Sequence, residues 1–213
     1  MKIEEEKLID KLMDVLSKGL PGLKSQLIAA PPFRANSFTD KDVMEARKAS
    51  VVFIIYPNDN KWEGVLIKRA SYDGVHSKQI AMPGGEREPA DVSDLYTAIR
   101  ECEEEIGVRL KKAQIIGALS PLYIPPSSFY VRPYLAYLES KPQFNIDPKE
   151  VEEVLFISMK RLCSENLWAE FDMKGVQVPG FELDGNVVWG ATAMMLAEIA
   201  DCCRDIFRDT FAT

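Results

Sequence analysis

The chain has 213 residues, of which 46% are hydrophobic and 28% charged, and its formal net charge is −7. A chain of this length can bury the core of one domain, so residues 1–213 are predicted to form a single domain. The acidic balance argues against a nucleic-acid partner, because phosphate backbones are bound by basic patches. No run of 18 or more apolar residues occurs, which argues against a membrane-spanning helix and a membrane partner.

The cysteines and the N-terminal residues bear on the compartment. The cysteines lack metal-site spacing, and adjacent Cys202 and Cys203 are poor disulfide partners. Residues 1–20 are acidic and amphipathic, without the apolar core of a signal peptide or the basic character of a transit peptide. We therefore expect reduced thiols and a cytoplasmic location.

The first part of the chain is predicted to be a helix followed by a long loop. Helical periodicity covers residues 3–20 and ends at Pro21-Gly22, so residues 1–22 are expected to pack on the domain as an N-terminal helix. Residues 21–49 are predicted to be loop. Short apolar runs bounded by turn residues predict strands further on, at 51–56, 64–69, 79–82, 115–119, 130–138, 151–157, 167–173 and 176–183.

The first two strands are expected to form a hairpin across the turn at 57–60. Pro133 interrupts a later strand and predicts that this strand lies at a sheet edge or contains a bulge. Two more helices are predicted, from residue 93 or 94 to 106 and from 190 to 207. Because strands and helices alternate along the chain, the fold class is predicted to be α/β, with helices layered on a sheet.

The helix at 94–106 carries the most informative pattern in the chain. At about 100° per residue, Glu101, Glu104 and Glu105 share a strip about 100° wide. Like charges at these spacings cost a few tenths of a kcal/mol per pair. A divalent cation converts that cost into a binding site, and Mg²⁺ prefers carboxylates, waters and phosphate oxygens as ligands.

A solvated acidic helix face is the other reading of this strip. Three features argue against it. Apolar residues from Leu95 to Ile106 bury the neighbouring side of the helix, and Arg100 is placed to brace the carboxylates. Gly84-Gly85 lies upstream, where backbone can approach a ligand closely. Gly107 is the usual residue at a helix C-terminus.

These residues resemble the Nudix box: a glycine, a spacer, then Arg100-Glu101-x-x-Glu104-Glu105-x-Gly107. The resemblance implies a Nudix-like α/β/α sandwich with a mixed sheet and a loop-helix-loop catalytic motif. It also implies hydrolysis of nucleoside diphosphate derivatives with Mg²⁺ or Mn²⁺. Glu101, Glu104, Glu105 and the Gly85 carbonyl are the implied metal ligands, with Arg100 orienting the glutamates and Glu104 or a loop glutamate accepting a proton.

Two departures from the general box resemble the coenzyme A pyrophosphatase branch of the family. Asp91 stands at the usual upstream glutamate position, and the gap to Arg100 is one residue longer. Other segments are similar to motifs of the same branch, namely residues 20–22, 30–34, 66–69, 72–77, 79–85, 121–129 and 189–193. The resemblance implies cleavage of coenzyme A or its derivatives to 3′,5′-ADP and 4′-phosphopantetheine, and a homodimer is compatible with it.

Substrate-binding candidates lie around the box. Arg69 can clamp a phosphate or be a surface strand charge. His76, the only histidine, can transfer protons or order its own loop. Lys78 replaces a glycine of the branch, so it can pair with a phosphate or obstruct a backbone approach. Gln79 belongs to the coenzyme A motif, and Ser128 to a polar turn that can touch ligand or simply enter a strand.

Two further readings remain open at this stage. The residues of the box are expected to bind only the metal and the diphosphate, so they do not distinguish one nucleotide substrate from another. ADP-ribose or a dinucleotide is therefore an alternative substrate. A ligand-sensing module without catalysis is the alternative from another class. The acidic run at Glu150, Glu152 and Glu153 is expected to be solvated, although one of these glutamates can supply a distant base.

Overall fold

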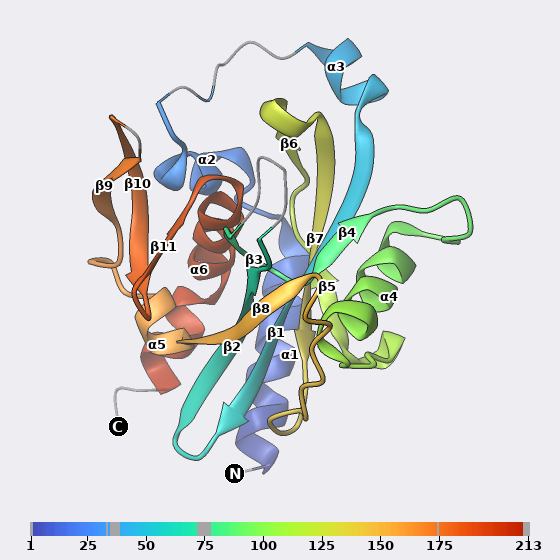
Figure 1. Cartoon of the computed structure of the whole chain (residues 1–213). Coiled ribbons are helices and arrows are strands. Elements are labelled where there is room, and N and C mark those ends of the chain that lie inside the picture. The colour runs from blue at the N-terminus through green and yellow to red at the C-terminus, as the bar shows by residue number, and fades with distance from the viewer. Residues whose placement is uncertain (1, 33, 35–38, 72–77, 174, 211–213) are drawn as a thin grey trace.

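A mixed sheet of eight strands forms the centre of the computed structural model, which describes residues 2–32, 34, 39–71, 78–173 and 175–210 (Figure 1). The strand order is β3-β2-β1-β7-β5, with β8 also paired to β2, β4 to β1 and β6 to β7. Strands β1 and β7 are parallel, whereas the other pairs are antiparallel. The strands are β1 (Arg47–Asn58), β2 (Lys61–Arg69), β3 (Ile80–Ala81), β4 (Gly84–Glu86), β5 (Ile115–Ala118), β6 (Leu122–Ile124), β7 (Phe129–Tyr137) and β8 (Val151–Ser158).

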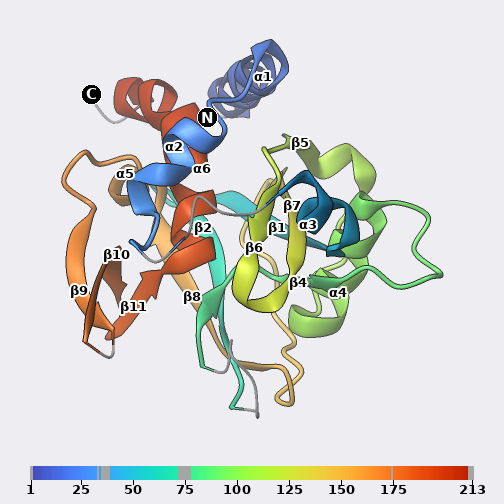
Figure 2. The same cartoon turned by 90° about the horizontal axis from the view of Figure 1, so that it is seen from above.

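Helices cover both faces of this sheet. Helix α4 (Asp94–Ile106) lies on one face, and α1 (Lys2–Lys18) and α6 (Gly190–Thr210) lie on the other (Figure 2). Alternate residues of β1 pack into the cores on the two sides of the sheet, because successive strand side chains point to opposite faces. Val52 and Ile54 pack in the core on the α4 side, and Phe53 packs in the core on the α6 side. Burial on both faces explains the continuous apolar run at 51–56, and the predicted α/β/α sandwich is confirmed.

The predicted hairpin is also confirmed, since β1 and β2 pair antiparallel across the turn at 57–60. A second, three-stranded sheet of order β11-β10-β9 lies beside α6 (Figure 1). It contains two predicted strands, β9 (Ala169–Met173) and β10 (Val176–Leu183), and one that the sequence did not predict, β11 (Asn186–Trp189). Short helical segments complete the fold, at α5 (Met159–Leu162), η2 (Lys112–Gln114) and η3 (Pro125–Ser127).

The prediction that residues 21–49 form only loop is wrong. This segment contains α2 (Leu23–Gln26), η1 (Leu27–Ala29), α3 (Asp40–Glu45) and the first residues of β1. Helix α3 begins with a capping box, in which Thr39 and Asp42 satisfy each other's backbone amides. These helices are too short to produce a hydrophobic period, so local capping was the only available signal.

The expectation that Pro133 marks an edge strand is wrong, because β7 lies between β1 and β5, and the bulge in the β5–β7 pairing falls in β5 between Ile115 and Gly117. The Pro133 carbonyl accepts a hydrogen bond from the Leu119 amide, at 2.9 Å, between the stretches where β5 and β6 pair with β7. The amide and carbonyl of one strand residue point the same way. The missing N–H of Pro133 therefore faces the break between two short partner strands, where no ladder bond is lost.

A buried carboxylate fixes the N-terminal segment to the last helix. Glu198 of α6 is fully buried and accepts hydrogen bonds from the Gly22 amide (3.1 Å), the Gln26 side chain (3.0 Å) and the Ser120 amide (3.3 Å).

Within the described part of the chain, no helix combines the length and apolar character needed to cross a membrane.

Candidate active site

Helix α4 has the boundaries that the sequence predicted. The Ser93 hydroxyl accepts a hydrogen bond from the Tyr96 amide at the N-terminus, and Gly107 adopts φ +70° at the C-terminus. Its apolar side packs through Cys102 and Ile106 onto the sheet, which leaves the carboxylates at the edge of the buried side. The helix is thereby held at a fixed rotation relative to β4 and β1.

Arg100 braces the box, as its position indicated. Its guanidinium donates to Asp91 (2.9 and 3.0 Å), to Glu101 (2.8 Å) and to Glu104 (2.8 Å). Asp91 also accepts bonds from the Thr97 hydroxyl and the Glu88 amide. The Arg100 hydrogen bonds hold the pKa of Asp91 well below its usual range. Asp91 thus serves to orient Arg100 in this structure.

Glu105 is the most deeply buried carboxylate of the box, with no exposed side-chain surface. One of its oxygens accepts a hydrogen bond from the Gly84 amide at 2.8 Å, and the other lies 3.3 Å from the Arg69 guanidinium. Burial raises the pKa of Glu105 to about 8, although the Gly84 bond and Arg69 both act in the opposite direction. The local environment therefore carries less positive charge than an ionised Glu105 requires.

The glycine pair is shaped around these glutamates. Gly84 has φ +149°, and a side chain there would collide with the backbone of Ser50 and Val51. At Gly85, a Cβ atom would collide with the Glu101 carboxylate. Glu101 is mostly buried, and burial raises its pKa. Close approach of β4 to β1 thus requires glycine at position 84, and close approach of β4 to α4 requires glycine at position 85.

Glu150 joins the box carboxylates from a distant part of the sequence. One oxygen each of Glu101, Glu105 and Glu150 lies within 4.8 Å of the others. Glu150 precedes β8, and its carbonyl accepts a hydrogen bond from the Ala70 amide just beyond β2, at 2.8 Å. The pairing of β8 with β2 therefore delivers this side chain, and no local sequence signal distinguished it from neighbouring Glu152, which pairs with Lys68.

Glu104 is placed differently from the other two box glutamates. Its side chain is 55% exposed and is paired with Arg100, so it does not share the three-carboxylate cluster. It lies on the same cleft nonetheless. Its assignments as metal ligand and proton acceptor stay predictions.

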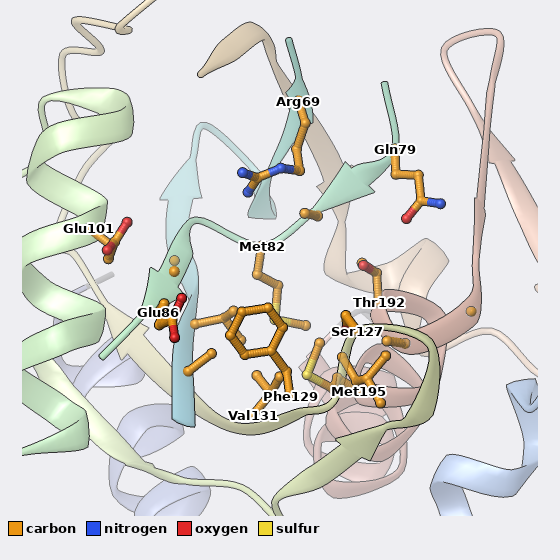
Figure 3. Close-up of a pocket in the computed structure, with 18 of the residues that line it drawn as sticks. Arg69, Gln79, Met82, Glu86, Glu101, Ser127, Phe129, Val131, Thr192 and Met195 are labelled. Carbon is orange, nitrogen blue, oxygen red and sulfur yellow. The ribbon is translucent and has the colours of Figure 1, made fainter. Parts of the chain in front are cut away.

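Glu101, Glu104 and Glu150 line a cleft of about 700 Å³ (Figure 3), whereas the buried Glu105 is outside its lining. Glu101 and Glu86 lie along one flank, Arg69 comes from the end of β2, and Gln79 from the residue before β3. The floor is apolar and is formed by Ile80, Met82, Ile124, Phe129, Val131 and Met195. An acidic cluster and an apolar surface thus share one cavity.

The remaining predicted site residues have different positions. Gly85 and Arg100 line the cleft, whereas Lys78 and Ser128 are outside its lining. Lys78 has φ +59° and Ser128 has φ +52°, both in the left-handed region that favours glycine. Ser127, which belongs to the same polar turn that the sequence indicated, lines the cleft in place of its neighbour. His76 lies outside the described residues.

Comparison with known proteins agrees with this geometry. The NUDIX domain profile matches residues 46–176. A Nudix hydrolase designated NudL from Photorhabdus laumondii is 29% identical over 140 residues, covering 64% of this chain and 74% of that protein. Nudix hydrolase 22, chloroplastic, from Arabidopsis thaliana is 33% identical over 165 residues, covering 72% of this chain and 54% of its own length, so the chain spans about half of that relative.

Among solved structures, a MutT/nudix family protein from Enterococcus faecalis superimposes with a TM-score of 0.54 at 14% sequence identity. The match covers 82% of this chain and 65% of that one, and at this identity it supports the fold alone. The profile match, the relatives and the glutamate-lined cleft all lead to one assignment. This chain belongs to the Nudix family and is a Nudix hydrolase, a class that acts on nucleoside diphosphate derivatives.

Proposed function

We propose that this protein is a Mg²⁺- or Mn²⁺-dependent pyrophosphohydrolase of coenzyme A or its derivatives. The observation that carries this proposal is the cleft, in which a cluster of three carboxylates adjoins an apolar floor. The products are 3′,5′-ADP and 4′-phosphopantetheine, or its acylated form.

The residues present fit a divalent cation. Carboxylate oxygens are the ligands that Mg²⁺ and Mn²⁺ prefer, and Glu101, Glu105 and Glu150 offer three of them at close range. The buried Glu105, with its pKa raised to about 8, supports the presence of a positive ligand, because a cation offsets the cost of its ionised form. A cation bound there supplies the positive charge that the diphosphate needs as a P–O bond breaks.

The side chains around the cluster have separable tasks in this proposal. Arg100 fixes the rotamers of Glu101 and Glu104 through its hydrogen bonds. Arg69, at the rim of the cluster, offers its guanidinium to the diphosphate. Water adds to phosphorus, its proton passes to Glu104 or Glu150, and the other phosphate leaves with the bridging oxygen.

Two observations support coenzyme A as the substrate. The segments similar to the coenzyme A motif meet at the cleft, because the Arg69 amide bonds to the Gln79 carbonyl at 3.0 Å and both side chains line the cavity. The apolar floor suits an aliphatic pantetheine arm, whereas the second sugar of ADP-ribose needs polar partners for its hydroxyls.

The test is hydrolysis of coenzyme A by purified protein with Mg²⁺ and, in parallel, Mn²⁺, followed by chromatography for 3′,5′-ADP. Glu105→Gln is expected to lose at least 100-fold in turnover. Glu103→Gln is the matched control on the exposed side of the same helix and is expected to behave as wild type. ADP-ribose and a dinucleotide complete the substrate panel.

Each outcome separates the alternatives. Equal rates on coenzyme A and ADP-ribose would remove the coenzyme A assignment and leave a general diphosphatase. Calorimetric binding without any product would favour a sensing module. Near wild-type turnover by Glu105→Gln at saturating metal would overturn the metal assignment itself.

A further inference from the structure

A second basic region lies in the same cleft, beside the carboxylate of Glu86. Arg47 of β1 is paired with Phe129 of β7, which is paired in turn with Ile124 of β6, so the three form one row across the sheet. The Arg47 guanidinium lies 4.1 Å from the centroid of the Phe129 ring. It also makes a bidentate ion pair with Glu86, at 2.8 and 2.6 Å. All four residues line the cleft.

Arg34 reaches the same row from the N-terminal segment. Its guanidinium donates to the carbonyl of Tyr123, the residue next to Ile124, at 2.6 Å. Burial lowers the pKa of Arg34, and no carboxylate among the described residues is paired with it. Arg34 is partly buried, and a partly buried cation without a counter-charge favours an anion supplied by a ligand.

The register of β1 separates this region from the metal cluster. Ser50 is paired with Gly85, and the Gly85 backbone adjoins Glu101. The Ser50–Gly85 row of the sheet therefore lies beside the carboxylate cluster. Arg47 is three residues away on the same strand, which corresponds to about 10 Å at 3.3 Å per residue. Arg69 belongs to the carboxylate cluster, because its guanidinium lies 3.3 Å from Glu105. The cleft therefore holds a second arginine region, which is offset along β1 from the row of Gly85 and is paired with Glu86.

We propose that Arg47, together with Arg34, binds a phosphate monoester on the substrate's ribose and so selects nucleotides that carry a phosphate besides the diphosphate. This inference rests on the proposed function and adds the residues that recognise the 3′-phosphate. The planar guanidinium of Arg47 binds Glu86 through two parallel bonds, and a phosphate offers the same geometry. Arg47 and Glu86 are 56% and 47% exposed, so their pair is weak and exchange for a doubly charged phosphate is favourable.

The decisive comparison is between coenzyme A and dephospho-coenzyme A, which share the diphosphate and the pantetheine arm and differ only in the 3′-phosphate. Arg47→Met keeps an unbranched side chain over Phe129 but removes the charge. We expect wild type to prefer coenzyme A, and Arg47→Met to raise KM for coenzyme A about 10- to 100-fold, the usual loss for a charge-assisted contact. Its kcat, and its KM for dephospho-coenzyme A, should stay unchanged.

Arg109→Met is the matched control, since Arg109 is an exposed arginine outside the cleft. Equal wild-type efficiency on the two substrates would overturn the inference while leaving the proposed function intact. Equal impairment of both substrates by Arg47→Met would also overturn it, because Arg47 would then act on the base or on the fold. Thermal unfolding of each variant shows whether the substitution has changed the stability of the fold.

A binding measurement keeps the inference testable if hydrolysis of coenzyme A is absent and the proposed function fails. Calorimetry with 3′,5′-ADP and with 5′-AMP, which differ only in the 3′-phosphate, reports the phosphate site alone when metal is absent. Wild type should bind 3′,5′-ADP at least 10-fold more tightly, and Arg47→Met should abolish that preference. No preference in wild type would refute the site.

Discussion

The buried Glu105 makes a prediction about stability as well as catalysis. Its pKa is raised from 4.5 to about 8 in the folded protein. Below pH 4.5 the folded and unfolded states both hold the proton. Between pH 4.5 and 8 the unfolded chain releases it while the folded protein keeps it, so wild-type stability falls as the pH rises. At about 1.4 kcal/mol per pH unit, the loss is about 5 kcal/mol once the pH exceeds 8.

Glu105→Gln removes this titration and keeps an oxygen that can accept the Gly84 amide hydrogen bond. In the absence of metal, the free energy of unfolding of the variant is therefore expected to rise relative to that of wild type, by about 5 kcal/mol between pH 4.5 and pH 9. Urea unfolding of both proteins in EDTA, at half-unit pH steps, measures the difference in unfolding free energy directly. Taking the difference cancels the titration of the other groups.

Saturating Mg²⁺ should narrow this difference at pH 8 by about half without reversing it. The cation binds the ionised form of wild type and adds about 2.7 kcal/mol at 100 times its dissociation constant, whereas Glu105→Gln lacks a ligand. A difference between the two metal-free proteins that changed by less than about 1 kcal/mol across this pH range would refute the reasoning. It would mean that Glu105 is ionised without cost, through a counter-charge in the folded protein.

Two substitutions test the backbone around the site. Gly85→Ala should weaken Mg²⁺ binding at least 10-fold by calorimetry, because the new methyl group displaces the Glu101 carboxylate; unchanged affinity would show that β4 can move away from α4. Lys78→Gly should raise the free energy of unfolding by about 1 kcal/mol in urea, because Lys78 has φ +59°, and a loss of stability would instead assign Lys78 a stabilising contact.

The sequence determined much of the site because its parts are local. Glu101, Glu104 and Glu105 belong to one helix, whose limits follow from Ser93, Gly107 and the apolar strip. The bracing role of Arg100 followed from its spacing to Glu104, which the 2.8 Å contact bears out. The apolar run of β1 and the hairpin with β2 were equally local, because strand period and turn residues lie within a few positions.

Some elements without a long period escaped sequence reasoning. Strands β4, β6 and β11 have three or four residues each and were not predicted, whereas the equally short β3 and β5 lie within the predicted strands at 79–82 and 115–119. The prediction of an edge strand from Pro133 failed for another reason. A proline disfavours a central strand only where its missing amide faces a partner, and the sequence does not show which residues lie opposite.

Tertiary structure alone decided which carboxylates meet. Helical geometry treats Glu104 and Glu105 alike, but the Gly84 amide and burial distinguish Glu105, while Arg100 holds Glu104 at the rim. Glu150 reaches the cluster because β8 pairs with β2, and Arg47 faces the same cleft through its register with Phe129. Helical spacing fixes which side chains share a face, whereas convergence of distant side chains depends on strand pairing, which the local sequence does not encode.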